Sequence, residues 1–307
     1  MIKEFCQKLM YKYAPPIEPP YEEKFFSGLN ELEFPKYLKL IYKIATGNKL
    51  NLKNPKTFRE KIQWLKLYGA TPLKTKLTDK VLVRDWVKEK IGEEYLKPVF
   101  QVCDDFSQID FSSLPQSFMI KVNHGCNWQF KIKNKDAFLK NKIVYNHIRD
   151  KFEFWLKESF WYWSAFEMQY KGIQPKIIIE PLFSSLDVQN ESIEYEIFCF
   201  NGKPQIYQVV SYSSFIETAV FDEEFYPSNI CFDRNIGKLF YEPDEQLKNA
   251  VELSKKLCEE FPFVKVGWTK FENKLYFNEL VFTPASGLMN LDDRDDEALG
   301  RMLVNYR

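Results

Sequence analysis

The chain has 307 residues, of which 45% are hydrophobic, enough to bury the core of one large domain or of two close subdomains. Its 43 basic residues balance 43 acidic ones, and because nucleic-acid binders carry a basic excess or stripe, that class of partner is disfavoured. Aromatic residues make up 17%, which suits a packed core and also a surface that stacks on sugars or bases.

The first predicted element is a short amphipathic helix over Met1–Tyr13, followed by a rigid break with four prolines in Ala14–Pro20. This helix lacks the long apolar run of a signal peptide or transmembrane span. Packing on the main body, or contact with a membrane surface or a pathway enzyme, would bury its apolar side. The six cysteines have no metal-ligand spacing, which indicates free thiols in a reducing compartment. We therefore expect a cytoplasmic protein, peripheral at the inner membrane face if this helix binds lipid.

Three helices and a strand are predicted next. The first helix spans Leu32–Thr46 and stops at Gly47. Thr57 and Glu60, three residues apart, form a capping box that opens the second. The third spans Asp79–Lys90, and we interpret Asp79, Lys80 and Arg84 as a surface ion cluster. Tyr95–Val102 reads as a strand with Pro98 near an edge.

The stretch Phe118–Phe130 organises the centre of the chain. An apolar strand carries Lys121 near its end, the polar turn Asn123–Asn127 follows, and a second strand starts at Trp128. A lysine at a strand end, beside a turn that presents backbone N–H groups, is a common way to hold nucleotide phosphates. A hairpin with a snorkelling surface lysine explains the same pattern about equally well.

The segment Ala137–Trp163 is predicted to be helical and is rich in aromatic residues, which form part of a core or, alternatively, a platform for an acceptor sugar. Lys176–Phe183 contains three consecutive isoleucines and reads as a buried strand that ends at Glu180-Pro181.

Two hairpins dominate the C-terminal part. One turns at Asn201-Gly202, the other at Glu272–Lys274, and the amphipathic helix Glu245–Phe261 lies between them. Helices and antiparallel strands without regular alternation predict an α+β fold. We divide the chain into an N-terminal lead-in (1–31), an N-terminal helical or α+β subdomain (32–117), a central subdomain with the polar turn (118–183) and a C-terminal subdomain (184–307).

An ordered series of motifs resembles the TupA-like ATP-grasp family, named for a teichuronopeptide biosynthesis protein. Its members occur in bacterial surface-polysaccharide biosynthesis, and many carry only the label of glycosyltransferase. The series covers about residues 35–290 and comprises Asn54–Leu65, Asp79-Lys80 with Arg84, Lys121–Gly125, Glu180, Phe198–Pro204, Phe261–Val264, and Glu279 with Pro284–Gly287.

The resemblance implies an ATP-grasp fold, with ATP between two antiparallel-sheet subdomains and Mg²⁺ on carboxylates. It implies that Lys121 contacts phosphate, that the turn with Asn123, His124, Gly125 and Asn127 covers the nucleotide, and that Glu180 lies at the hinge near the adenine. His124 is a candidate catalytic group beside Lys121, with a turn histidine that bonds backbone as the simpler interpretation. The resemblance further implies that Glu279 binds the metal.

Four positions depart from the family pattern. The pattern has a lysine or arginine at Glu196, an aspartate at Gly267, a threonine at Val281 and a second glycine at Asn127. Glu196 adds a like charge near a triphosphate, and Gly267 removes a hard oxygen ligand from the metal. Glu196 is itself a candidate metal ligand that would restore part of the charge balance.

Three functions are consistent with these residues. The first is an ATP- and Mg²⁺-dependent ligase that joins an amine or amino acid to a uronic acid of a surface glycan, through an acyl phosphate. The second is a glycosyltransferase that uses a nucleotide sugar in capsule or lipopolysaccharide biosynthesis, although no Asp-x-Asp motif follows a strand. The third is a degenerate ATP-grasp protein that binds a glycan or partner without turnover. We favour the first.

Overall fold

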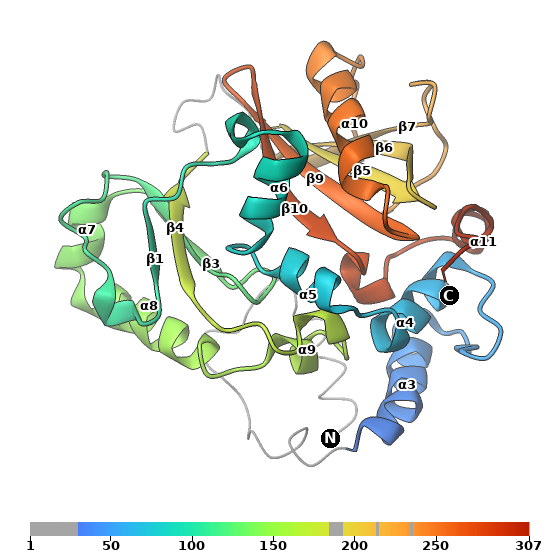
Figure 1. Ribbon diagram of the computed structural model, residues 1–307, viewed down its shortest axis with the longest axis horizontal. Coiled ribbons are helices and arrows are strands. Elements are labelled where there is room, and N and C mark those ends of the chain that lie inside the picture. Colours follow the sequence, from blue (N-terminus) through green and yellow to red (C-terminus); the bar gives the residue numbers. More distant parts are fainter. Residues whose placement is uncertain (1–29, 184–192, 213–214, 234–235, 307) are drawn as a thin grey trace.

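The computed structural model describes residues 30–183, 193–212, 215–233 and 236–306 (Figure 1). The predicted helix Met1–Tyr13 and the proline-rich break after it lie outside this part of the chain. Two sheets organise the described residues, with strand orders β1-β4-β2-β3 and β10-β9-β5-β6-β7-β8. The predicted α+β class is confirmed, and the four-stranded sheet lies on the opposite side of helix α6 from much of the six-stranded sheet (Figure 1).

The four-stranded sheet is antiparallel throughout and consists of β1 (Gln101–Cys103), β2 (Phe118–Val122), β3 (Gln129–Ile132) and β4 (Ile177–Pro181). The strand predicted over Tyr95–Val102 is wrong in extent. Glu93–Tyr95 forms a 3₁₀ turn, and Leu96 makes a bridge with Phe277 of the other sheet. Pro98 has no N–H for a ladder, and bonding to β4 begins two residues later, where the N–H of Phe100 donates to the carbonyl of Ile179 at 2.8 Å.

Three helices form where one continuous helical segment was predicted: α7 (Lys135–Lys140), α8 (Lys142–Trp155) and α9 (Phe160–Trp163). Helices α7 and α8 pack on this sheet, whereas Trp161 of α9 packs in the core of α3 (Phe34–Thr46). Asn141 causes the first break. Its backbone is non-helical (φ −84°, ψ 87°), and its side chain accepts a hydrogen bond from the N–H of Val144. An asparagine that caps the next helix competes with continuing the previous one.

The six-stranded sheet consists of β5 (Ile193–Phe200), β6 (Lys203–Tyr212), β7 (Ile216–Phe221), β8 (Gly237–Lys238), β9 (Phe263–Phe271) and β10 (Lys274–Val281). Both predicted hairpins are present. Asn201 and Gly202 have φ of 50° and 75°, and Glu272 and Asn273 have φ of 48° and 59°. These positive values are those that a type I′ turn requires. Strands β7 and β8 were not predicted.

The two faces of this sheet differ in character. Helices α6 (Val83–Ile91) and α10 (Glu245–Cys258) bury one face in an apolar core that includes Trp268. On the other face, one end packs through Phe198, Phe200 and Phe263 against α4 (Phe58–Tyr68) and α11 (Asp293–Met302). The remainder of that face is polar and carries Glu194, Glu196, Gln208, Lys265, Gly267, Thr269 and Glu279.

The N-terminal helices follow the sequence signals with one displacement. Helix α3 (Phe34–Thr46) ends at Gly47 in the left-handed conformation, and Thr57 and Glu60 form the predicted capping box of α4. Helix α5 (Pro72–Thr78) was not predicted. Helix α6 begins at Val83 rather than at Asp79, because Asp79 is extended and its carboxylate accepts from the N–H of Val81 at 2.8 Å. No helix in the described ranges is long and apolar enough to cross a membrane.

Candidate active site

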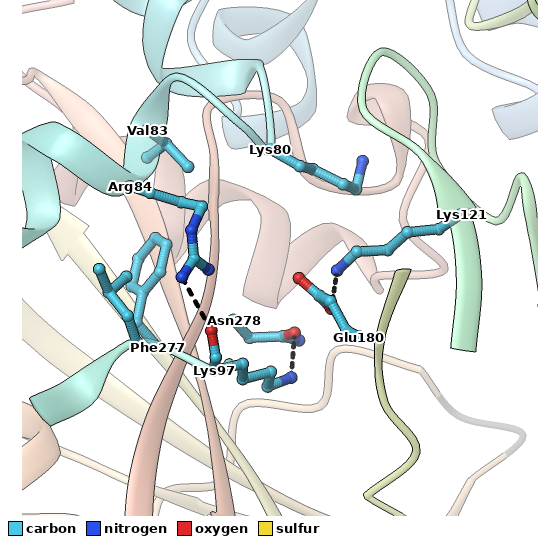
Figure 2. Close-up of a pocket in the computed structure, with 9 residues that line it drawn as sticks. Lys80, Val83, Arg84, Lys97, Lys121, Glu180, Phe277 and Asn278 are labelled. Carbon is cyan, nitrogen blue, oxygen red and sulfur yellow. Dashed lines mark hydrogen bonds and ion pairs between the residues drawn. The ribbon is translucent and has the colours of Figure 1, made fainter. Parts of the chain in front are cut away.

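A pocket lies where the two sheets approach each other. It is lined by four cationic side chains, one carboxylate and four other residues, namely Lys80, Arg84, Lys97, Lys121, Glu180, Val83, Leu96, Phe277 and Asn278 (Figure 2). The residues come from both sheets, from the start of α6 and the turn before it, and from the segment between α6 and β1. Because four cations meet a single carboxylate in this lining, the pocket suits an anionic ligand.

Lys121 and Glu180 form the centre of this lining. The strand register places Lys121 opposite Ile178 and Glu180 opposite Met119, so the two side chains share one face of adjacent strands. Lys121 Nζ lies 2.5 Å from a Glu180 carboxylate oxygen, and the side chains are 12% and 8% exposed (Figure 2). Two residues predicted for nucleotide binding are thus brought together as a nearly buried ion pair. Removing one partner would leave a desolvated charge.

The position of Lys80 differs from the prediction. Asp79, Lys80 and Arg84 were expected to form a surface ion cluster, but Asp79 is buried and both cations line the pocket. Lys80 Nζ donates to the carbonyl of Gly125 at 2.5 Å, and its backbone N–H donates to the carbonyl of Asn123 at 3.2 Å. Burial lowers the pKa of Lys80, whose amine donates to a neutral carbonyl. Asp79 is engaged in the turn before α6 and so is not available for a surface ion pair.

The turn between β2 and β3 is fixed from beneath. The side chain of Asn123 accepts from the N–H of Lys176 at 2.7 Å and donates to the carbonyl of Gln174 at 2.9 Å. Asn127 has φ of 61°, a left-handed conformation that asparagine tolerates, which accounts for the glycine expected at this position. At Gly125, an added Cβ would come within 2.7 Å of the Trp128 ring, so this site requires glycine.

His124 lies beneath the turn rather than in the pocket lining. It is 3% exposed, its ring meets Trp128 edge-on, and its Nε2 lies 3.0 Å from the carbonyl of Trp155. A carbonyl only accepts, so Nε2 carries the proton, and burial lowers the pKa of the imidazole. These contacts support a role in holding the turn. A catalytic role for His124 stays a prediction.

The candidate metal ligands lie in one row across the six-stranded sheet. Glu196 of β5 is opposite Gly267 of β9, which is opposite Glu279 of β10, so all three positions point to the same face. Glu196 pairs with Lys265, and the pair is largely buried. Burial acts to lower the pKa of Lys265, but Glu196 and Glu279 outweigh it and raise that pKa. The negative charge that Glu196 brings is thus largely balanced by Lys265.

The row of Glu196, Gly267 and Glu279 could supply only some of the ligands of a cation. Within the described residues, no group of three or more His, Cys, Asp or Glu side chains is close enough to hold a metal ion. Mg²⁺ often takes one or two carboxylates and completes its shell with water and substrate phosphates, so two glutamates beside a phosphate pocket fit that pattern. Gly267 stands between them, and an added Cβ there would meet Glu279 at an ordinary 3.4 Å.

Sequence reasoning missed Lys97 and Asn278. Lys97 Nζ donates to Asn278 Oδ1 at 2.9 Å, and the bridge between Leu96 and Phe277 fixes their approach (Figure 2). Lys97 lies in a segment read as an edge strand, and Asn278 sits at an irregularity in the pairing of β9 and β10. Neither position carries a local sequence signal for an anion site.

Several solved structures are similar to this chain at low sequence identity. Among solved structures, a D-alanine–D-alanine ligase from Bacillus anthracis matches at 14% identity and TM-score 0.41 over 74% of this chain and 64% of that one. The ATP-grasp ligase PsnB, complexed with minimal precursor, Mg and ADP, matches at 9% identity and TM-score 0.42 over 95% of this chain and 79% of that one.

A D-alanine–D-alanine ligase from Helicobacter pylori matches at 14% identity and TM-score 0.37 over 74% of this chain and 61% of that one. The chain thus spans less than two thirds of the length of these two D-alanine–D-alanine ligases. No curated protein matches. The family model described as TupA-like ATP-grasp matches residues 60–304, which include both sheets and every residue of the pocket. The chain therefore belongs to the TupA-like ATP-grasp family, and its fold is the α+β ATP-grasp fold.

Proposed function

We propose that this protein is an ATP- and Mg²⁺-dependent carboxylate–amine ligase that modifies a uronic acid of a bacterial cell-surface polysaccharide. Family membership supports the ligase class. The observation that carries the proposal is the cationic pocket of Lys80, Arg84, Lys97 and Lys121 beside the row of Glu196 and Glu279. A phosphate site next to a metal-binding carboxylate row is what phosphoryl transfer from ATP needs.

The residues would divide the work as follows. Lys121, held by Glu180, and Lys80 would bind phosphate oxygens, and the turn Asn123–Asn127 would cover them. Lys80 would exchange the carbonyl of Gly125 for a charged acceptor, which binds a cation more strongly. Glu279 and Glu196 would hold Mg²⁺, which when bound neutralises charge on the phosphates. Glu180 would lie at the adenine hinge.

The proposed reaction has two balanced steps. A carboxylate oxygen of the uronic acid attacks the γ-phosphorus of ATP, a new O–P bond forms, and the bond to ADP breaks. The amine nitrogen of the co-substrate then attacks the acyl carbon and a C–N bond forms. The C–O bond to phosphate breaks, phosphate leaves with that oxygen and the electron pair, and the amine proton passes to solvent. The pocket supplies positioning and charge neutralisation for the first step.

One observation favours a second candidate, a protein that has kept the fold and lost turnover. Gly267 occupies the centre of the carboxylate row without a side chain, and Glu196 is bound by Lys265. Such a protein would bind glycan or partner without consuming ATP.

Isotope transfer tests the ligase. The chain would be incubated with ATP, Mg²⁺, a uronic-acid saccharide labelled with ¹⁸O in its carboxylate, and a mixture of amino acids. An acyl-phosphate route places one ¹⁸O atom in each inorganic phosphate released with ADP. Inorganic phosphate without ¹⁸O would refute the acyl phosphate, because its fourth oxygen would then come from solvent, and the absence of ADP with any uronic acid would favour the protein without turnover.

A further inference from the structure

The backbone of Lys97 is held beside β10 of the six-stranded sheet. Its neighbour Leu96 bridges to Phe277 of β10, and its own carbonyl accepts from the Arg84 guanidinium at 2.9 Å. From this fixed position its side chain reaches β10, where Nζ donates to Asn278 Oδ1 at 2.9 Å (Figure 2). Contacts with α6 and β10 therefore fix the position of the amine.

Among the residues that the structure describes, the amine forms no ion pair. Its hydrogen-bond acceptor is a neutral amide, and the Phe183 ring lies 5.6 Å away. Lys121 of β2 repels it, and Glu180, Glu194 and Glu279 attract it from three other strands without forming an ion pair with it in the described structure. Burial, reinforced by Lys121, lowers the pKa of Lys97 to about 8 despite these carboxylates. A bound anion would restore the stability of its charged form.

The charge of the opposing sheet face explains why a cation is needed there. That face presents Glu194, Glu196 and Glu279, and Lys265 on the same face is paired with Glu196. A polyphosphate held by Lys80 and Lys121 on the small-sheet side would approach these carboxylates and be repelled. Lys97 places a positive charge on β10, on the large-sheet side of the same pocket.

We propose that Lys97 is a third ligand of the polyphosphate chain, exchanging Asn278 Oδ1 for phosphate oxygen when the ligand binds between the sheets. The inference deepens the proposed function and rests on it for the nucleotide that carries the polyphosphate. Its chemistry requires only an anion with several phosphoryl groups.

The test measures equilibrium binding of three probes, ATP, inorganic tripolyphosphate and adenosine, to the full chain without metal. Lys97→Met removes the charge and keeps most of the stem, and Lys97→Arg keeps the charge. Lys176→Met is the matched control, because the Lys176 side chain is 37% exposed in a surface pair with Asp104 and does not line the pocket. Thermal unfolding of each variant establishes that it is folded before binding is compared.

We expect Lys97→Met to weaken ATP and tripolyphosphate by at least about tenfold, and Lys97→Arg and Lys176→Met to change them by less than about threefold, since loss of a charge-assisted hydrogen bond has that magnitude. Normal binding of both anions by folded Lys97→Met would overturn the inference. If the parent chain binds tripolyphosphate through Lys97 but not ATP, the inference stands and the proposed function fails. If it binds neither anion, both fail.

Discussion

Gly267→Asp places a carboxylate at the centre of the row formed by Glu196 and Glu279. The backbone has room for it, because an added Cβ would lie 3.4 Å from Glu279 Cγ and Gly267 does not have a positive φ. Directly opposed side chains in antiparallel strands are roughly 5 Å apart, where two like charges repel by about 3 kcal/mol at an effective dielectric of 20. Lys265 already balances Glu196, so Glu279 is the main source of this repulsion.

Without divalent ions, Gly267→Asp should therefore lower the free energy of unfolding by about 1–3 kcal/mol, because the sheet face is only partly buried and solvent screens the pair. Mg²⁺ that binds only the folded row restores about 2.7 kcal/mol at 100 times its dissociation constant. Urea unfolding with Mg²⁺ and with a chelator measures both quantities. Gly267→Asn, of the same size and without charge, is the control.

A Gly267→Asp variant whose stability responds to Mg²⁺ no more than that of Gly267→Asn would refute the assignment of this row as a metal site. A loss of stability shared equally by both variants would show that packing, not charge, decides the outcome at this position.

Three further predictions follow from the same contacts. Lys121→Met should lower the free energy of unfolding by about 3–5 kcal/mol because it leaves Glu180 nearly buried and unpaired, and adding Glu180→Gln should recover most of this in chemical unfolding; equal stability of the single and double variants would contradict a coupled pair. The pKa of Lys97 is lowered to about 8 in the folded chain, against about 10.4 in the unfolded chain. Between these pH values the unfolded chain keeps a proton there that the folded chain has released, so the free energy of unfolding should rise with pH. Urea unfolding of Lys97→Met should show a smaller rise over the same range. Thr57→Ala should cost about 1 kcal/mol by losing the capping box of α4, and a change below about 0.3 kcal/mol would contradict that role.

The sequence was informative wherever a local rule decides the structure. The capping box at Thr57, the positive-φ turn at Asn201-Gly202 and the helix stop at Gly47 depend on a few neighbouring residues, and each is present. The strand of Lys121 was recognised by its apolar run. Elements without such signals, such as the two-residue strand β8, were missed because only their partner strand makes them strands.

The site was predicted less completely because it is assembled across the fold. Lys121 and Glu180 were named separately from motifs, but their ion pair depends on the register between β2 and β4. Lys80 was assigned to the surface because its helix was started too early, and Lys97 was overlooked because Asn278, its partner, lies 181 positions later in the chain. Contacts of that separation leave no trace in local pattern.

Thermal unfolding of the full chain in the presence of Mg²⁺ with ATP, ADP or a panel of UDP-, GDP- and CMP-sugars tests the central claim most directly, since ligands that bind only the folded state raise the midpoint. The pocket between the two sheets predicts a rise with ATP and Mg²⁺ that Lys121→Met/Glu180→Gln abolishes. A rise with one nucleotide sugar and none with ATP would contradict the ligase and indicate a glycosyltransferase, and no rise with any nucleotide would contradict nucleotide binding itself.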